Sequence, residues 1–173
     1  AKAVNFGIIY GIGDYSLSQD LKIPKKVAAE YIRNYLDKYS GVSEYLESVK
    51  RQARENGYVD TIFGRRRYIP EINAGNKNLQ AFGERVAMNT PIQGAAADLI
   101  KIAMIRVDRM LREAGLKARL ILQIHDELII ESPIEEADRA EQILREAMQG
   151  AAELKVPLQV DIGKGKSWFD AKD

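Results

Sequence analysis

The chain has 173 residues, of which 46% are hydrophobic and 29% are charged, a composition typical of a soluble globular protein with one domain or two lobes sharing a core. Its 26 basic and 25 acidic residues leave a net charge of +1, which argues neither for nor against a nucleic-acid partner. The absence of cysteine and the single histidine exclude disulfides, thiolate chemistry and histidine-rich metal sites, and a chain with no signal peptide or membrane-length apolar run is expected in the cytoplasm.

The opening stretch KAVNFGIIYG predicts a helix. Lys2, Phe6 and Tyr10 are spaced four residues apart, so they line one side of it. Gly7 and Gly11 are poor helix formers, and tertiary contacts must therefore hold this helix. A cation and two aromatic rings in register could bind a triphosphate and stack on a base, although such rings, taken alone, more often belong to the core.

Two further helices and a hairpin complete a mainly helical first part, which ends near residue 77. Pro24 is expected as the first residue of one helix and Ser40 as the cap of the next, which stops at Gly57. Residues 57–72 then predict a short hairpin that turns near Gly64.

A basic cluster covers the end of the second of these helices and the hairpin. Between residues 50 and 67, six cations against Glu55 and Asp60 leave an excess of four positive charges. Such a cluster could meet phosphates, although most runs of this kind are simply solvated. The six cations are Lys50, Arg51, Arg54, Arg65, Arg66 and Arg67.

A long apolar helix is predicted from Leu79 to a stop at Gly115. Pro91 is expected to interrupt it, because proline lacks the amide hydrogen that a helix interior needs. After the interruption, Ile102 and Ile105 widen the apolar stripe. We therefore expect this part of the helix to be buried on more than one side.

Three hydrogen-bond donors lie on the first half of this helix. Arg85, Asn89 and Gln93 follow at steps of four and share one face, with Pro91 making the register approximate. Such a row could donate to the purine N3 and pyrimidine O2 acceptors of the minor groove, and so test base-pair shape without reading sequence. An ordinary polar face in water is the alternative.

The second part of the chain alternates long helices with a small sheet. Residues 117–132 predict a hairpin in which Leu120, Leu122 and Ile124 alternate on one side. The last helix is expected to begin with a capping box from Ser132 to Glu135, and a final strand is expected over 158–162. The predicted inner face of that helix is Ala137, Ala140, Leu144, Ala147, Ala151 and Leu154.

The tip of this hairpin is the clearest candidate site. It places His125 beside the two acids Asp126 and Glu127, between strands that are expected to be buried. Paired carboxylates at a strand end suit a hard cation such as Mg²⁺. A solvated turn is the alternative, since turns favour aspartate, although Asn-Gly would form an easier turn.

Four segments, taken in chain order, carry a family resemblance: KAVNFGIIYG, GRRRYIPEI, AMNTPIQGAAADLIK and QIHDELI. Together they resemble the carboxyl-terminal part of family A DNA polymerases, the bacterial DNA polymerase I group, and the resemblance covers essentially the whole chain. It implies an α+β fold, with a helical fingers lobe followed by part of the palm, which has a small antiparallel sheet and long packed helices. We expect the fingers over residues 1–77 and the palm over residues 78–173.

The resemblance implies a nucleotide site on the opening helix. Lys2 matches the lysine that binds the phosphates of the incoming nucleotide, Phe6 the residue against its sugar and base, and Tyr10 the residue near the templating base. In the family, phenylalanine at the Phe6 position goes with rejection of sugars that lack a 3′-hydroxyl, whereas tyrosine admits them.

The resemblance also implies a metal ligand and contacts with DNA. Asp126 matches one of two aspartates that bind Mg²⁺, and Glu127 has a lesser catalytic role beside it. The implied partners are primer–template DNA and deoxynucleoside triphosphates, with no membrane. The positions that match contacts with the primer–template, the nascent pair or the primer end are Arg85, Asn89, Gln93, Gln123 and His125.

Three parts of the family pattern have no counterpart in this sequence: the DYSQIE-like segment with the other catalytic aspartate, the arginine one turn before Lys2, and the thumb. We therefore expect that the chain begins inside the nucleotide-binding helix of a longer protein and supplies half of a metal site. On its own it should bind DNA weakly, extend no primer detectably, and self-associate through exposed palm surface.

The predicted function is DNA-templated nucleotidyl transfer in replication and repair, in which the primer 3′-hydroxyl attacks the α-phosphate. Mg²⁺ held partly by Asp126 would activate that hydroxyl, and Lys2 would stabilise charge on the triphosphate. The alternative is a non-catalytic nucleic-acid-binding module that keeps the polymerase surfaces. The coding sequence upstream would distinguish the two, because only an active enzyme needs the second aspartate segment.

Overall fold

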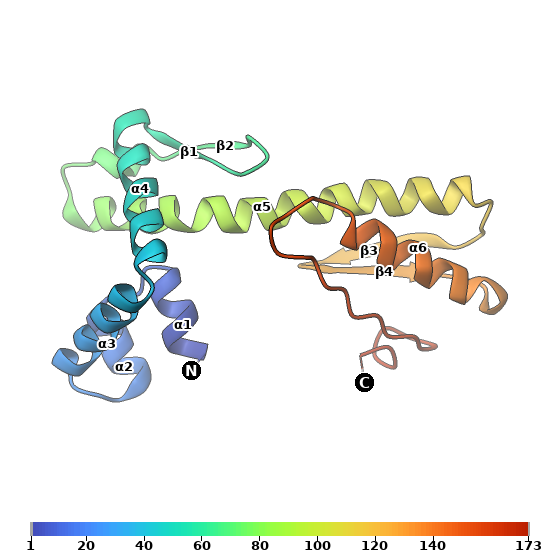
Figure 1. Cartoon of the computed structure of the whole chain (residues 1–173), viewed down its shortest axis with the longest axis horizontal. Helices are drawn as coiled ribbons and strands as arrows, with labels where there is room; N and C mark the ends of the chain where they lie inside the picture. Colours follow the sequence, from blue (N-terminus) through green and yellow to red (C-terminus); the bar gives the residue numbers. More distant parts are fainter. Residues whose placement is uncertain (1, 173) are drawn as a thin grey trace. The chain divides into compact units, whose positions relative to one another are not determined.

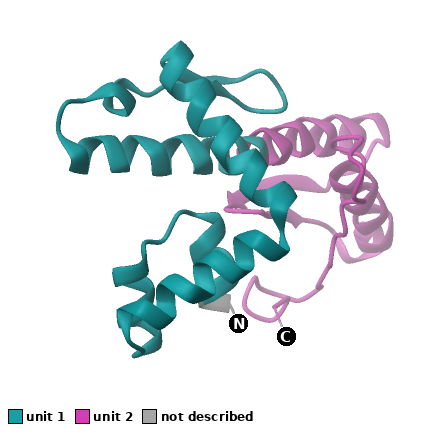
Figure 2. Ribbon diagram, turned by 60° about the vertical axis from the view of Figure 1, so that its left-hand side comes forward, with its two compact units in different colours: residues 1–95 teal, residues 96–173 magenta. Residues whose placement is uncertain are grey.

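The computed structural model of the chain describes residues 2–172. The chain divides into two compact units, Ala1–Ala95 and Ala96–Asp173 (Figure 2). Each unit combines helices with one two-stranded antiparallel sheet (Figure 1), which confirms the predicted α+β class. The division into fingers and palm at residue 77 is a functional one and stays a prediction.

None of the helices within residues 2–172 is both long and apolar enough to cross a membrane.

The first unit begins with four helices: α1 (Lys2–Ile9), α2 (Asp14–Leu21), α3 (Lys25–Lys38) and α4 (Ser40–Asn56). The predicted stop of α4 is confirmed, because Gly57 follows it in the left-handed conformation at φ 77°. Two predicted helix starts are wrong by one residue. Pro24 precedes α3 instead of opening it, and Ser40 lies inside α4 because Tyr39 is the N-cap residue of that helix.

The predicted hairpin of the first unit is confirmed. β1 (Tyr58–Asp60) pairs with β2 (Arg66–Tyr68), and Gly64 supplies a positive φ of 76° between them. A short 3₁₀ turn, η1 (Pro70–Asn73), follows. The buried residues that join α4, this segment and the next helix are Val49, Ala53, Val59, Ile69, Ile72 and Ala87.

The next helix, α5 (Lys77–Glu113), runs without a break for 37 residues and passes through Pro91. The predicted interruption is therefore wrong. Proline deprives the Ala87 carbonyl of its helical hydrogen bond, but Pro91 is itself buried. Packing of this segment offsets the lost bond, and the helix continues.

The second half of α5 lies in the second unit and stops as predicted, with Gly115 at φ 67°. Ala103 and Val107 are buried in the core of that unit, and Ile102 packs against it. Ile105, however, is 69% exposed. The expected widening of the apolar stripe is therefore confirmed at Ile102 and wrong at Ile105.

The second hairpin is confirmed as β3 (Arg119–Ile124) paired with β4 (Glu127–Glu131). The predicted regular alternation of its first strand is wrong. A bulge between Leu120 and Leu122 leaves Ile121 without a paired residue, so the following side chains change face. Leu120 consequently packs on the core, whereas Leu122 is 42% exposed.

The predicted capping box of the last helix is wrong. A 3₁₀ turn, η2 (Ile134–Glu136), comes before α6 (Ala137–Gln149), and the hydroxyl of Ser132 bonds to the adjacent Pro133 carbonyl. Glu136 instead connects the start of α6 to the segment before β3. Its Oε2 atom accepts hydrogen bonds from the backbone amides of Lys117 and Ala118 at 2.8 and 3.0 Å. A contact between distant segments thus replaces the local cap.

The inner face of α6 is largely confirmed. Ala140, Leu144 and Ala147 are buried against α5 and the sheet, together with Ala151 just beyond the helix. Sequence analysis missed Ile143, which is 1% exposed, and wrongly included Leu154, which lies past the helix end and is 39% exposed. The reason for the second error is that the helix stops at Gln149.

The predicted final strand over 158–162 is also wrong, because this segment pairs with no strand in the described part of the chain. The tail is instead held by α6 through charge. Lys164 lies 2.7 Å from both Asp138 and Glu141, and Arg145 donates to the Val160 carbonyl at 2.8 Å. The hydrogen bonds from Lys164 lower the pKa of Asp138 and of Glu141 and raise the pKa of the lysine.

The role of Glu136 gives a direct test of the start of α6. Replacing Glu136 with Ala should lower the free energy of unfolding by about 1–3 kcal/mol, because the buried Ala118 amide loses its acceptor. Glu135→Ala is the matched control and should change it by less than about 0.5 kcal/mol. Urea denaturation measures both variants. An equal or larger loss for Glu135→Ala would restore the capping box that the sequence suggested.

Candidate functional site

The aromatic side chains predicted to meet a nucleotide lie together on α1. The rings of Phe6 and Tyr10 are stacked, with centroids 6.2 Å apart and an angle of 22° between planes. They are 51% and 37% exposed, so neither belongs to the core. Lys2 is the first residue of α1, but its side chain lies outside the described part of the structure.

The end of α1 lies against α5. Gly11 has a φ of 79°, and a Cβ there would collide with Met88 Cε and lie 3.4 Å from Cγ of Arg85. Only glycine allows this approach without strain. The first unit therefore brings the end of α1, where Tyr10 precedes Gly11, close to Arg85, the first of the three donors on α5.

The three donors occupy one continuous face, because α5 does not break at Pro91. Arg85 and Gln93 are exposed and Asn89 is half-buried. The Asn89 Oδ1 atom is buried and has no hydrogen-bond partner in the described part of the chain. A buried polar atom without a partner is costly, and here it lies in the middle of the row of donors.

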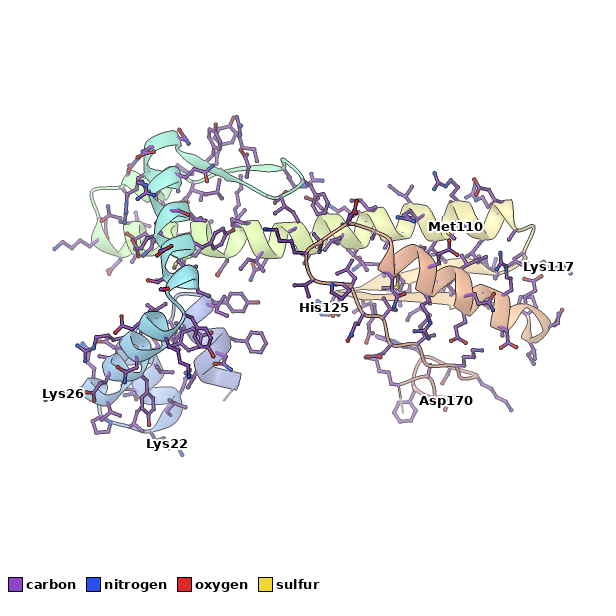
Figure 3. All side chains as sticks on the ribbon, in the orientation of Figure 1. Lys22, Lys26, Met110, Lys117, His125 and Asp170 are labelled. Atoms are coloured by element: carbon purple, nitrogen blue, oxygen red, sulfur yellow. The ribbon has the colours of Figure 1, made fainter. Side chains whose placement is uncertain are left out.

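The tip of the β3–β4 hairpin, in the second unit, is a two-residue turn. Ile124 pairs with Glu127, which leaves His125 and Asp126 between the strands. Figure 3 labels His125 at this tip. His125 has a φ of 51°, a left-handed conformation that costs energy for any residue with a Cβ. Gln123 stabilises it by donating from Nε2 to the His125 carbonyl at 2.8 Å. Asp126, the other residue of this turn, is exposed to solvent.

Glu127 has a partner that sequence analysis missed. Its Oε1 atom lies 3.2 Å from Nζ of Lys172, while its Oε2 atom is buried and has no hydrogen-bond partner among the described residues. No local pattern could indicate this pair, since the lysine comes from the tail at the far end of the sequence.

The carboxylates at this turn do not complete a Mg²⁺ site. Within residues 2–172, the structure brings no three histidine, aspartate or glutamate side chains together as a metal would require. One oxygen of Glu127 faces Lys172, so Asp126 is the carboxylate left for a cation. A hard divalent ion needs more oxygen ligands than one side chain provides.

Acids pair with at least three of the six cations of the basic cluster. Arg54 pairs with Glu84 and Lys50 with Glu47. Arg66 donates to Asp60 at 3.0 Å and lies 3.6 Å over the ring of Tyr58, and the hydrogen bond to Asp60 raises the pKa of the guanidinium. These pairs reduce the positive charge that this surface can offer to phosphates.

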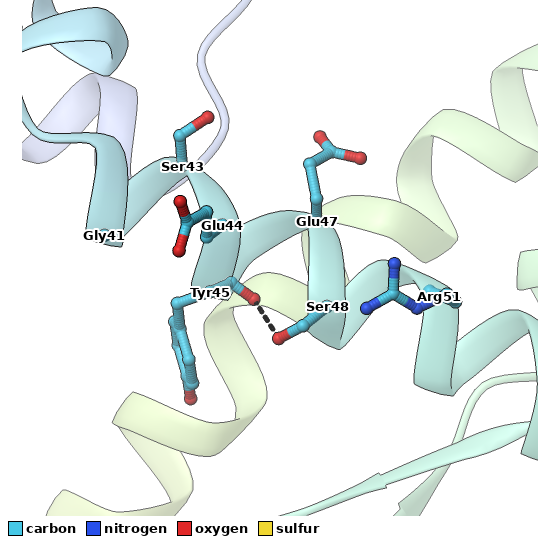
Figure 4. Close-up of a pocket in the computed structure, with 7 residues that line it drawn as sticks. All are labelled: Gly41, Ser43, Glu44, Tyr45, Glu47, Ser48 and Arg51. Atoms are coloured by element: carbon cyan, nitrogen blue, oxygen red, sulfur yellow. Dashed lines mark hydrogen bonds between the residues drawn. The ribbon is translucent and has the colours of Figure 1, made fainter.

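A surface hollow on α4 contains Arg51 of the basic cluster but none of the residues predicted to bind the nucleotide, the metal or the primer–template (Figure 4). All of its lining residues come from that one helix, and the Ser48 hydroxyl donates to the Tyr45 carbonyl at 2.7 Å. The hollow therefore has no assembly of groups from different elements. Its lining residues are Gly41, Ser43, Glu44, Tyr45, Glu47, Ser48 and Arg51.

Comparison with known proteins gives one consistent result. Residues 1–170 match the family model described as DNA polymerase family A. The chain is 55% identical over 172 residues to DNA polymerase I of Bacillus subtilis strain 168 and 53% identical to that of Geobacillus stearothermophilus. Each alignment covers 99% of this chain and 20% of the relative, so the chain spans about a fifth of their length.

A solved structure shows the same fold. The POL domain of Pol1 from M. smegmatis, in complex with DNA primer–template and dNTP, superposes with a TM-score of 0.96 at 46% identity. The match covers 99% of this chain and 30% of that one.

Proposed function

Because the chain belongs to DNA polymerase family A, we propose that it forms part of an enzyme that carries out template-directed nucleotidyl transfer to a primer 3′-hydroxyl. The observation that carries this proposal is the match of essentially the whole chain, at 46% identity, to a polymerase domain bound to primer–template and dNTP. In the proposal, residues 1–77 act as fingers and residues 78–173 as palm.

The proposed nucleotide site is the exposed aromatic side of α1. Phe6 would lie against the sugar and base, Tyr10 near the templating base, and Lys2 on the phosphates, where its charge would stabilise the triphosphate in the transition state. The stacked and exposed rings support this role, because core residues would be covered. The helical spacing of Phe6 and Tyr10 alone was compatible with a nucleotide site and with a place in the core.

The proposed DNA surface is the row of donors on α5. Arg85, Asn89 and Gln93 would donate to minor-groove acceptors of the primer–template and the nascent pair. The placement of the exposed Arg85 and Gln93 and the half-buried Asn89 on one unbroken helix supports this role. At the second unit, His125 and Gln123 would flank the primer end.

Asp126 is proposed as one ligand of the catalytic Mg²⁺, with Glu127 in a lesser role. Bound Mg²⁺ lowers the pKa of an attacking hydroxyl and neutralises phosphate charge. The described residues lack the further ligands, so the remaining ones would have to come from other parts of a full-length protein. In the proposal, this chain holds Asp126 at a turn in which Gln123 hydrogen-bonds to the strained His125.

A non-catalytic nucleic-acid-binding module remains the second candidate. It is favoured by one observation, the lack of a carboxylate cluster within residues 2–172. The two candidates differ in what Asp126 does, because a binding module has no use for a metal-binding carboxylate at that position.

Substitution of Asp126 separates them. In a full-length protein that carries this chain, Asp126→Asn should slow primer extension by about a hundredfold or more, with little effect on the affinity for primer–template. Asp161→Asn, at another exposed aspartate of the same unit, is the control and should extend normally. Extension of a labelled primer and a filter-binding assay measure the two quantities. Normal extension by Asp126→Asn would end the enzymatic assignment of this residue.

A second substitution tests the position of Phe6. Phe6→Tyr should raise incorporation of dideoxynucleotides relative to deoxynucleotides by about tenfold, because the added hydroxyl can supply one hydrogen bond where the sugar lacks its own. Phe82→Tyr, at a ring with similar exposure on α5, should leave the ratio unchanged. Competition between the two nucleotide types on one template measures it. Equal ratios for Phe6→Tyr and the unmodified protein would show that this ring does not face the sugar.

A further inference from the structure

The tail of the chain returns to the turn that carries Asp126. After α6 the chain runs past the turn end of the β3–β4 hairpin (Figure 1). Its last described residue, Lys172, reaches Glu127 with 3.2 Å between Nζ and Oε1. Glu127 is the first residue of β4 and the direct neighbour of Asp126. The contact thus joins two segments that are far apart in the sequence but within one unit.

Lys172 is held in place from its own side as well. A compact turn precedes it, in which the Ser167 hydroxyl donates to Asp170 Oδ2 at 2.7 Å and the Lys172 amide donates to the Phe169 carbonyl at 3.2 Å. The ammonium group also lies 4.8 Å from the centre of the Trp168 ring, within the range of a cation–π contact. Both the backbone and the charged end of the lysine therefore have defined positions.

Glu127 depends on this lysine more than an ordinary surface glutamate would. One of its oxygens is buried without a hydrogen-bond partner in the described part of the chain, and the other faces Lys172. A partly desolvated carboxylate that lost its counter-charge would turn toward water. The Glu127 carboxylate could then adopt several orientations beside Asp126. This would happen next to a turn in which His125 already has a strained backbone conformation.

We propose that Lys172 is a positioning residue for the catalytic turn: it holds Glu127 in one orientation, so that Asp126 is the single carboxylate presented at the tip. This inference rests on the proposed function. On the side before Asp126, Gln123 donates a hydrogen bond to the His125 carbonyl. On the side after Asp126, Lys172 forms an ion pair with Glu127. The tail is then a structural part of the proposed active site.

Two substitutions in the tail form the test. Lys172→Met removes the charge and keeps the length of the side chain, and Lys172→Arg keeps the charge. Lys166→Met is the matched control, at an exposed lysine of the same tail for which the described structure has no ion pair. Trp168 is the only tryptophan of the chain, so its fluorescence reports on docking of the tail without interference.

The first measurement needs no catalysis. In the labelled 173-residue chain, Lys172→Met should shift the NMR amide signals of residues 125–127 and red-shift Trp168 emission, whereas Lys172→Arg and Lys166→Met should resemble the unmodified chain. Glu127→Gln should shift the same amides, and adding Lys172→Met to it should change them little further, because the pair is already broken. Unchanged amides in Lys172→Met, or equal shifts in Lys166→Met, would overturn the proposal.

The second measurement uses a full-length protein that carries the chain. Lys172→Met should lower kcat for primer extension by about fivefold and leave KM for DNA and for the nucleotide within about twofold of the unmodified protein. Lys172→Arg should recover most of kcat. A raised KM for DNA at unchanged kcat would instead make Lys172 a phosphate contact and overturn the positioning role. Failure of the unmodified protein to extend primers would reject the proposed function, while the amide signals would still decide the role of Lys172.

Discussion

The continuity of α5 through Pro91 is the constraint on which the proposed DNA surface depends. Gln93 lies beyond the proline and Arg85 and Asn89 lie before it, so a break at this point would rotate Gln93 out of the row. A proline inside a helix costs about 3 kcal/mol or more through the lost hydrogen bond and the clash of its ring. Burial of the proline in the packed first unit offsets that cost here. The same helix supplies Ala87 to the core of the first unit and Val107 to the core of the second.

At the other candidate site, the chain combines strain with charge. A histidine in the left-handed conformation costs energy, and the adjacent carboxylates of Asp126 and Glu127 repel each other. Gln123 and Lys172 counter both problems, the first through a hydrogen bond to the His125 carbonyl and the second through an ion pair with Glu127. Such a combination is expected where function requires a fixed side chain, because stability alone would select an easier turn.

Local chemistry made several features predictable from the sequence. The ends of α4 and α5 and the first hairpin turn were identified because Gly57, Gly115 and Gly64 act within a few residues of themselves.

Long-range contacts account for the failures. Glu136 bonds to amides that lie before β3, and packing overrides Pro91. The bulge at Ile121 and the unpaired segment over 158–162 likewise depend on neighbours that periodicity does not reveal. For the site, spacing identified the candidate residues and the turn, but it could indicate neither Lys172 nor the approach of Gly11 to Arg85.

The central claim is that Arg85, Asn89 and Gln93 form one DNA-binding row along an unbroken helix. A titration of the ¹⁵N-labelled chain with a primer–template duplex, followed by NMR at low salt, tests it most directly, since weak binding suffices for chemical-shift changes. The account predicts that the largest shifts fall on these three residues, on both sides of Pro91, and that added salt reverses them. Shifts that stop at Pro91, or that are confined to the basic hairpin of residues 58–68, would contradict it.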